Sequence, residues 1–184
     1  MKKALLIACA LAAVLAGACS KQALKVTYDK QITYIEGFIS AQMKADTNAT
    51  LTRNEGAYRL TLHDTLDVNR DSLRMGGRVS LYYACYVLSS SSVSNSNLVA
   101  TNKQDIATAA GWNLTNTSQF KLDTLTLDGT LLNGFRMGLQ GVQPKDEAYI
   151  LFTGEYGYGK QERGTIPAKS ALAYHIWIEK IDND

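Results

Sequence analysis

The sequence has little proline and no excess of charge of either sign. Only Pro144 and Pro167 occur in 184 residues, and 19 Lys and Arg against 17 Asp and Glu leave a formal net charge of +2. This balance, without any block of like charges, gives no electrostatic case for a nucleic-acid partner. The hydrophobic fraction of 46% is that of an ordinary globular protein, and the length suits one domain with a small addition.

Motifs for metal, nucleotide and nucleophilic chemistry are also missing. The two histidines, His63 and His175, do not stand at a metal-ligand spacing, so the sequence predicts no metal and no cofactor. We expect His175 in a terminal strand whose outward positions face solvent. No G-x-G-x-x-G, P-loop or G-x-S-x-G pattern occurs, so neither nucleotide binding nor Ser-His-Asp catalysis has support.

Cysteine is confined almost entirely to the N-terminus. Lys2 and Lys3, an apolar run over residues 4–14 and small residues before Cys19 are typical of a secretory signal. The ending LAGAC resembles a bacterial lipobox, which implies a signal peptide over residues 1–18 and a diacylglycerol on Cys19. A secreted protein cut nearby is the alternative. Cys85 is then the only thiol of the mature chain, in a strand pattern, and we expect it to be a buried small hydrophobe.

The residue after the lipobox bears on location. Ser20 follows Cys19, and in well-studied bacterial lipoproteins a residue other than Asp there favours the outer membrane. We therefore expect an outer-membrane lipoprotein that is held by its lipid anchor and faces the periplasm.

The hydrophobic period changes once along the chain. A tether over 20–28 and an amphipathic helix over 29–43, capped by Asp29, make up the predicted segment 19–54, which ends in a polar break at 47–56. From residue 55 the period is two. The expected strands cover 58–64, 79–88, 119–127, 147–157 and 170–181, with a helical turn at 105–112 and a short helix at 131–142. This order predicts an α+β fold over 55–184, in which an antiparallel sheet wraps around one short α-helix behind an N-terminal helical extension.

The C-terminal half carries a family resemblance. The stretches LLNGFRMGLQGV, AYILFTGEYGYG and GTIPAKSALAYHIWIEKI follow one another with the spacing of the FKBP-type peptidyl-prolyl cis-trans isomerases. GGRVSLYYACYVL resembles an earlier strand of that family, and LVATN resembles its Phe-Asp-Thr-Asn segment. The resemblance covers roughly residues 55–184 and implies an FKBP-like fold with an apolar cup for proline.

The resemblance also implies the site residues. Tyr158 would hydrogen-bond substrate through its hydroxyl and Leu132 through its backbone N–H, whereas Tyr156 would pack as structure. The catalytic positions implied are Tyr158, Leu132, Phe135 and Tyr83, and the substrate-binding walls are Val99, Phe120, Leu131, Ile166 and Tyr174. Without the resemblance, packing in the core would be the favoured role for all these aromatic side chains.

One departure from the family qualifies the expected activity. Ala100 stands where the family has its pocket aspartate, and Asp105 is the other carboxylate considered for the site. We expect a peptidyl-prolyl isomerase of the cell envelope that assists folding of proline-containing exported polypeptides, with activity lowered by Ala100. A catalytically decayed proline-peptide-binding module or chaperone is the alternative, and a structural partner in an envelope complex is a third. The sequence leaves clients and oligomeric state open.

A short Asp-Ser/Thr-apolar pattern occurs three times and resembles the O-glycosylation acceptor of some gut-type bacteria. It would place glycans on Thr65, Ser72 and Thr124. The alternative is that these positions are ordinary turns and strand edges.

Overall fold

A computed structural model describes the backbone of residues 2–62 and 70–184, with side chains from residue 21 onward. Thr65 and the side chain of Cys19 therefore lie outside the described residues. Ser72 and Thr124 are described, and both hydroxyls are engaged. Gln143 donates to Ser72 Oγ at 3.2 Å, and Thr124 shares a hydrogen bond of 2.9 Å with Ser80.

The N-terminal helix is longer than the sequence predicted. Helix α1 covers Lys2–Ala45 without interruption, so the cap predicted at Asp29 is wrong and residues 20–28 continue the helix. The physical reason is that no glycine or proline stands between Gly17 and Gly37 to end a helix. In the described part of the chain, no helix is both long and apolar enough to cross a membrane.

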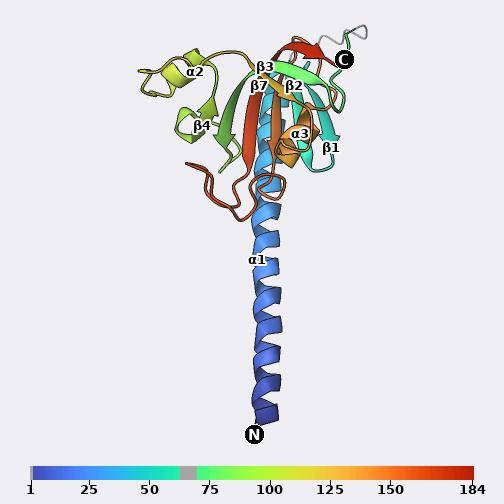
Figure 1. The fold of residues 1–184 in the computed structure, drawn as a ribbon, viewed down its shortest axis with the longest axis vertical. Coiled ribbons are helices and arrows are strands. Elements are labelled where there is room, and N and C mark those ends of the chain that lie inside the picture. The colour runs from blue at the N-terminus through green and yellow to red at the C-terminus, as the bar shows by residue number, and fades with distance from the viewer. Residues whose placement is uncertain (1, 63–69) are drawn as a thin grey trace.

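Across residues 2–62 and 70–184, seven antiparallel strands form one sheet in the order β1-β2-β6-β7-β3-β4 (Figure 1). Strand β5 pairs with the N-terminal part of β3. The strands are β1 Thr50–Asn54, β2 Ala57–Leu62, β3 Arg78–Val87, β4 Leu98–Thr101, β5 Asp123–Thr126, β6 Glu147–Phe152 and β7 Leu172–Asp182. Short helices α2, Gln104–Ala109, and α3, Asn133–Leu139, lie between strands. The predicted polar break at 47–56 is wrong in part, because it contains β1 and the turn into β2. The α+β fold with an antiparallel sheet is confirmed.

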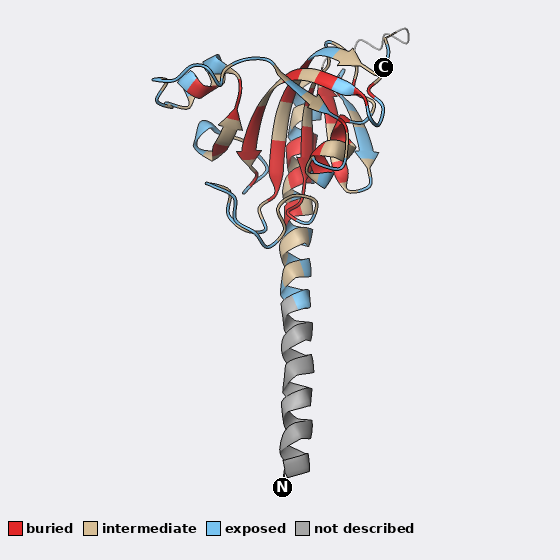
Figure 2. Cartoon of the chain, in the orientation of Figure 1, coloured by how far each residue is buried: buried red, intermediate tan, exposed pale blue. Residues whose placement is uncertain are grey.

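Both faces of the sheet are covered. Alternate residues of β7 point to opposite faces, so Tyr174 and Ile176 join one core cluster and Ala173 joins the other. Helix α3 contributes Phe135 and Leu139 to the first cluster. Helix α1 crosses the opposite face, where Ile35, Phe38 and Ile39 are at most 5% exposed. Figures 1 and 2 show the result: a sheet with buried strands between α3 and the upper part of α1.

Two glycines let α3 lie close to the sheet. Gly134 and Gly138 stand four residues apart, hence on one side of the helix. A Cβ at Gly134 would come within 2.2 Å of the Phe152 ring, and one at Gly138 within 2.1 Å of Ile150. The helix therefore contacts β6 by its backbone, and this close approach fixes the depth at which Phe135 lies.

We predict that Gly138→Ala lowers the free energy of unfolding by about 1–3 kcal/mol, because the added methyl group overpacks the contact with Ile150. Chemical denaturation measures the change. Gly129→Ala is the matched control, since a Cβ there meets no atom within 4 Å, and it should leave stability unchanged. Equal effects of the two substitutions would contradict the packing argument.

Candidate active site

Three aromatic rings from three elements lie together on the α3 side of the sheet, at the place that the resemblance implies for the proline cup. The Phe135 ring from α3 stacks on the Tyr174 ring from β7, with centroids 4.3 Å apart and planes at 30°. Tyr83 from β3 lies beside Tyr174 at 6.2 Å. Phe135 is 5% exposed and the tyrosines are half-buried, so the three rings, here called the floor of the cup, form an apolar surface that solvent reaches in part.

Tyr174 has Cys85 as its neighbour on the adjacent strand. Cys85 on β3 stands opposite Tyr174 on β7, so the two side chains lie next to each other on one face of the sheet. Burial raises the pKa of the Cys85 thiol to about 12, and it raises the pKa of Tyr174 well above its usual value. Both groups therefore stay neutral, and the expectation of a buried, unreactive Cys85 agrees with this environment.

The loop between β6 and β7 closes one side of the cup. Gly159 N–H donates to the Gly154 carbonyl at 2.8 Å, which folds the loop back on itself. The φ of Gly159 is +56°, a left-handed conformation that favours glycine. Ile166 pairs with Arg163 in an isolated bridge further along the loop. Tyr158 and Ile166 both pack against the core cluster of the cup.

The two tyrosines of the sequence EYGYG have different surroundings. The Tyr156 ring lies so close to Gly56 that a Cβ there would approach it to 2.3 Å. The Tyr156 carbonyl accepts a hydrogen bond of 2.8 Å from Gly134 N–H, which fixes the start of α3. The Tyr158 hydroxyl has no protein partner among the described residues, so it is available to a bound molecule.

The remaining predicted residues are brought together with one exception. Leu131, Leu132 and Val99 all pack against the cup's cluster. Leu132 immediately precedes α3, and within the described chain its N–H meets no acceptor. Phe120 is half-buried in the segment before β5 and is not among the described side chains packed on this cluster. The role predicted for Phe120 as a wall thus lacks support from its position.

A cavity of about 490 Å³ lies beside the cup. Val99, Pro167 and Trp112 are among the residues that line it. Val99 also packs against the cup's cluster, so the cavity and the cup share this residue.

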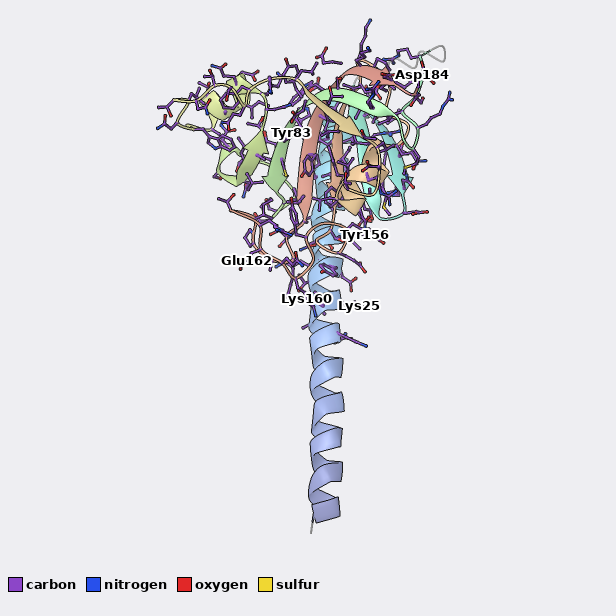
Figure 3. The ribbon with its side chains drawn as sticks, in the orientation of Figure 1. Lys25, Tyr83, Tyr156, Lys160, Glu162 and Asp184 are labelled. Carbon is purple, nitrogen blue, oxygen red and sulfur yellow. The ribbon has the colours of Figure 1, made fainter. Side chains whose placement is uncertain are left out.

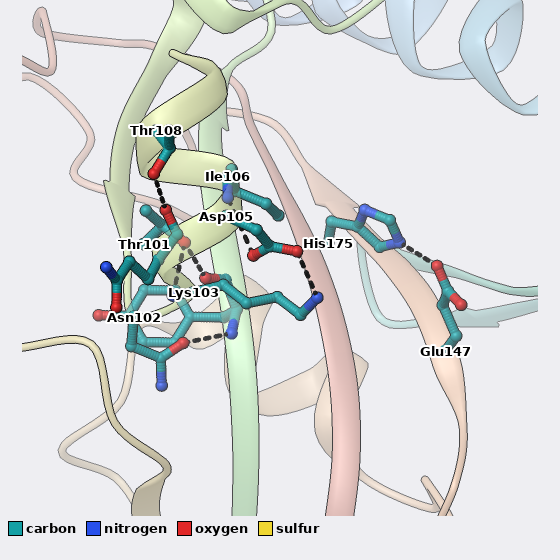
Figure 4. A network of polar contacts seen from close by, with 10 residues as sticks. Thr101, Asn102, Lys103, Asp105, Ile106, Thr108, Glu147 and His175 are labelled. Atoms are coloured by element: carbon teal, nitrogen blue, oxygen red, sulfur yellow. Dashed lines mark hydrogen bonds and ion pairs between the residues drawn. The ribbon is translucent and has the colours of Figure 1, made fainter. Parts of the chain in front are cut away.

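Asp105 does not reach the cup. Its carboxylate accepts a hydrogen bond of 3.1 Å from Lys103 Nζ, and Lys103 lies over the Trp177 ring at 4.7 Å. Trp177 belongs to the cluster on the α1 face of the sheet, so Asp105 lies on the α1 side and not on the side of the cup (Figure 4).

His175 lies on that same face with its side chain only 14% exposed, so the expectation that it faces solvent is wrong. Its ring stacks on Tyr149 at 4.1 Å and lies 3.9 Å from Trp177, while its Nε2 hydrogen-bonds Glu147 at 2.8 Å (Figure 4). Burial lowers the pKa of His175 to about 4 despite the opposing effect of Glu147. A neutral, stacked histidine is structural.

The sequence profile of the FKBP-type peptidyl-prolyl cis-trans isomerases matches residues 71–179. This chain belongs to that family. Every side chain of the aromatic floor falls within the matched region, so the enzyme is a peptidyl-prolyl isomerase by family.

Solved FKBP-type structures share the fold. FkpA from Escherichia coli aligns with a TM-score of 0.56 and 14% identity, over 96% of this chain and 72% of that one. A peptidyl-prolyl isomerase from Pseudomonas syringae gives 0.56 and 14%, over 86% and 96%. The three FKBP domains of wheat FKBP73 give 0.56 and 12%, over 74% of this chain, which spans 52% of that structure. No curated protein sequence matches the chain.

The FKBP fold here carries a carboxylate that the sequence did not reveal. Asp123 on β5 pairs with Leu81 on β3, so both side chains point to one face of the sheet. Tyr83 follows two residues later on that same face, which is the cup's face. Burial raises the pKa of Tyr83, and the negative charge of Asp123 raises it further. Only the pairing of β5 with β3 brings this charge near the cup, whereas Ala100 leaves none on β4.

Proposed function

We propose that this chain catalyses cis–trans isomerisation of X-Pro bonds in exported polypeptides at the cell envelope, at a rate lowered by Ala100. The observation that carries the proposal is the open aromatic floor of Phe135, Tyr174 and Tyr83, bordered by Tyr158 and Ile166. Stacked aromatic rings of this kind suit an apolar group such as a proline ring.

The chemistry needs no nucleophile. Rotation about the peptide bond has a barrier of about 18–20 kcal/mol because the nitrogen lone pair is delocalised. X-Pro bonds isomerise without help over roughly tens to hundreds of seconds. The twisted transition state has lost this conjugation and carries less charge, so an apolar surface favours it over the solvated planar form.

Hydrogen bonds would hold the substrate during rotation. The Tyr158 hydroxyl and the Leu132 N–H meet no partner within the described chain, and both border the apolar cluster of the cup. Two donors beside one apolar surface can hold carbonyl groups on either side of the rotating bond. The ring would then rest on Phe135 while the peptide turns.

A second function, proline-peptide binding without turnover, is favoured by one observation. Ala100 pairs with Cys85 and packs against the cup's cluster, so β4 presents a methyl group in place of a carboxylate. Fixed charges near a reacting centre contribute to catalysis more than to ground-state binding. Loss of such a charge would thus reduce turnover before it reduced affinity.

The envelope location rests on sequence features alone. Lys2, Lys3 and the apolar run before Cys19 support export and lipidation, and the part of α1 that follows Cys19 would hold the domain away from the bilayer. Two or more acyl chains on one residue give stable membrane anchoring.

The decisive test of function is exchange NMR on an Ala-Leu-Pro-Phe peptide with catalytic amounts of the full chain. We predict cis–trans exchange cross-peaks, and we predict that Tyr158→Phe lowers kcat/KM about tenfold, the effect of losing one hydrogen bond. Tyr156→Phe is the matched control, because that ring packs on Gly56, and it should retain activity. Shifts of the peptide signals without exchange would identify a binding module. If neither exchange nor shifts are observed, the proposed function is wrong.

A carboxylate restored at position 100 should raise activity. We predict that Ala100→Asp increases kcat/KM by about tenfold or more, because a fixed charge beside the cup orients groups around the substrate. Ala100→Asn is the control of equal size without the charge. If the Asp and Asn variants have equal activity in the same NMR assay, the charge lost at this position does not limit turnover.

The location has its own test. We predict that Cys19→Ala moves the protein from the outer-membrane fraction to a soluble fraction, since the acyl chains have no other attachment site. Fractionation followed by immunoblotting measures this. Cys85→Ser, which changes the buried thiol, should stay with the membrane. An unchanged distribution of the Cys19 variant would overturn the lipid anchor.

A further inference from the structure

One side chain of α1 holds both ends of the loop that closes the cup. Gln31 is 8% exposed. Its Nε2 donates to the Lys169 carbonyl at 2.5 Å, and its Oε1 accepts from Gly154 N–H at 2.9 Å. Gly154 and Lys169 begin and end the segment that carries Tyr158 and Ile166, so a single amide bridges the two roots of this loop.

The loop roots need such a partner. They are already in close contact, because a Cβ at Gly154 would lie 2.4 Å from the Lys169 carbonyl oxygen. Lys169 also has a φ of +62°, which is unfavourable for a residue with a side chain. Without Gln31, a buried N–H and a carbonyl would both lose their hydrogen bonds, which favours opening of the loop.

The position of Gln31 is set by packing elsewhere on α1. Ile35, Phe38 and Ile39 follow at spacings of four, seven and eight residues, hence on the same side of the helix, and are buried against the sheet. Near Gln31, two cavities of about 460 and 450 Å³ flank α1, one lined by Lys169 and the other by Thr153 and Tyr156.

The pictures agree with this arrangement. Figure 3 shows Lys160 and Glu162 of the loop at the end of the domain from which α1 leaves, with Lys25 of the helix nearby. The family match begins at residue 71, so α1 lies outside it.

We propose that Gln31 is a positioning residue for the site: through it, α1 keeps the loop of residues 154–169 in the conformation that presents Tyr158 and Ile166 to substrate. The inference rests on the proposed function for its consequence in catalysis, but the order of the loop can be measured without any activity. Helix α1 then contributes to the function of the isomerase by ordering this loop.

The test uses the full chain with Gln31→Met, which keeps the length of the side chain and removes both hydrogen bonds. Hydrogen exchange at the Gly159 and Lys169 amides, which are bonded inside the loop, should become about tenfold faster. For the same peptide, KM should rise several-fold with a smaller change in kcat, because the substrate now has to order the loop. Both measurements are made at a temperature well below the thermal unfolding midpoint.

Phe38→Leu is the matched control. It weakens the packing of α1, where Phe38 meets the Tyr149 ring at 4.9 Å, without touching the loop. It should lower stability and leave loop exchange and KM at their wild-type values. Unchanged loop exchange in Gln31→Met, or the same acceleration in Phe38→Leu, would overturn the proposal. If wild type shows no turnover, the proposed function fails, and the exchange rates still decide whether Gln31 orders the loop.

Discussion

The register of β3 on β7 is the constraint on which the rest of the structure depends. These central strands pair over the full length of β3, from Arg78 with Asp182 to Val87 with Leu172. Because side chains alternate between faces, a slip of one residue would turn Tyr83 and Tyr174 away from α3. Tyr174 and Cys85 are a directly opposed pair, and both side chains belong to the cluster that packs against α3. The aromatic floor, the glycine contacts of α3 and the loop that follows β6 all depend on this alignment.

In this protein both faces of the sheet are covered, whereas an antiparallel sheet can leave one face to solvent. Ala84 and Tyr86 of β3 are buried beneath α1, while Leu81 and Cys85 are buried beneath α3. This explains why the strand sequence is apolar almost throughout. It also explains the wrong prediction for His175, since an alternating pattern alone does not tell whether a helix from elsewhere covers the outward face.

Local patterns could predict the elements, and long-range pairing could not be predicted. The alternation in YRLTLHD and the spacing in LLNGFRMGLQGV gave β2 and α3, and the family motifs led to Phe135, Tyr174 and Tyr158. The influence of Asp123 on Tyr83 depends on how β5 aligns with β3, which no local feature encodes. Gln31 is one polar residue on an otherwise apolar helix side, and only the position of the loop roots gives it a meaning. Phe120 was placed by motif order alone, in a segment whose path the motifs do not constrain.

The continuous α1 also gives the domain a geometric property. Residues 21–30 precede the buried part of the helix and are mostly exposed. They form a helical segment about 15 Å long that leads to the sheet. Unlike a flexible linker, a helix fixes both the distance and the orientation of the domain relative to whatever holds its N-terminus. Whatever holds the N-terminus, the cup and its loop would sample a thin layer at a set distance from that support. Polypeptides that pass through this layer would meet the cup at a high effective concentration, whereas those beyond it would not.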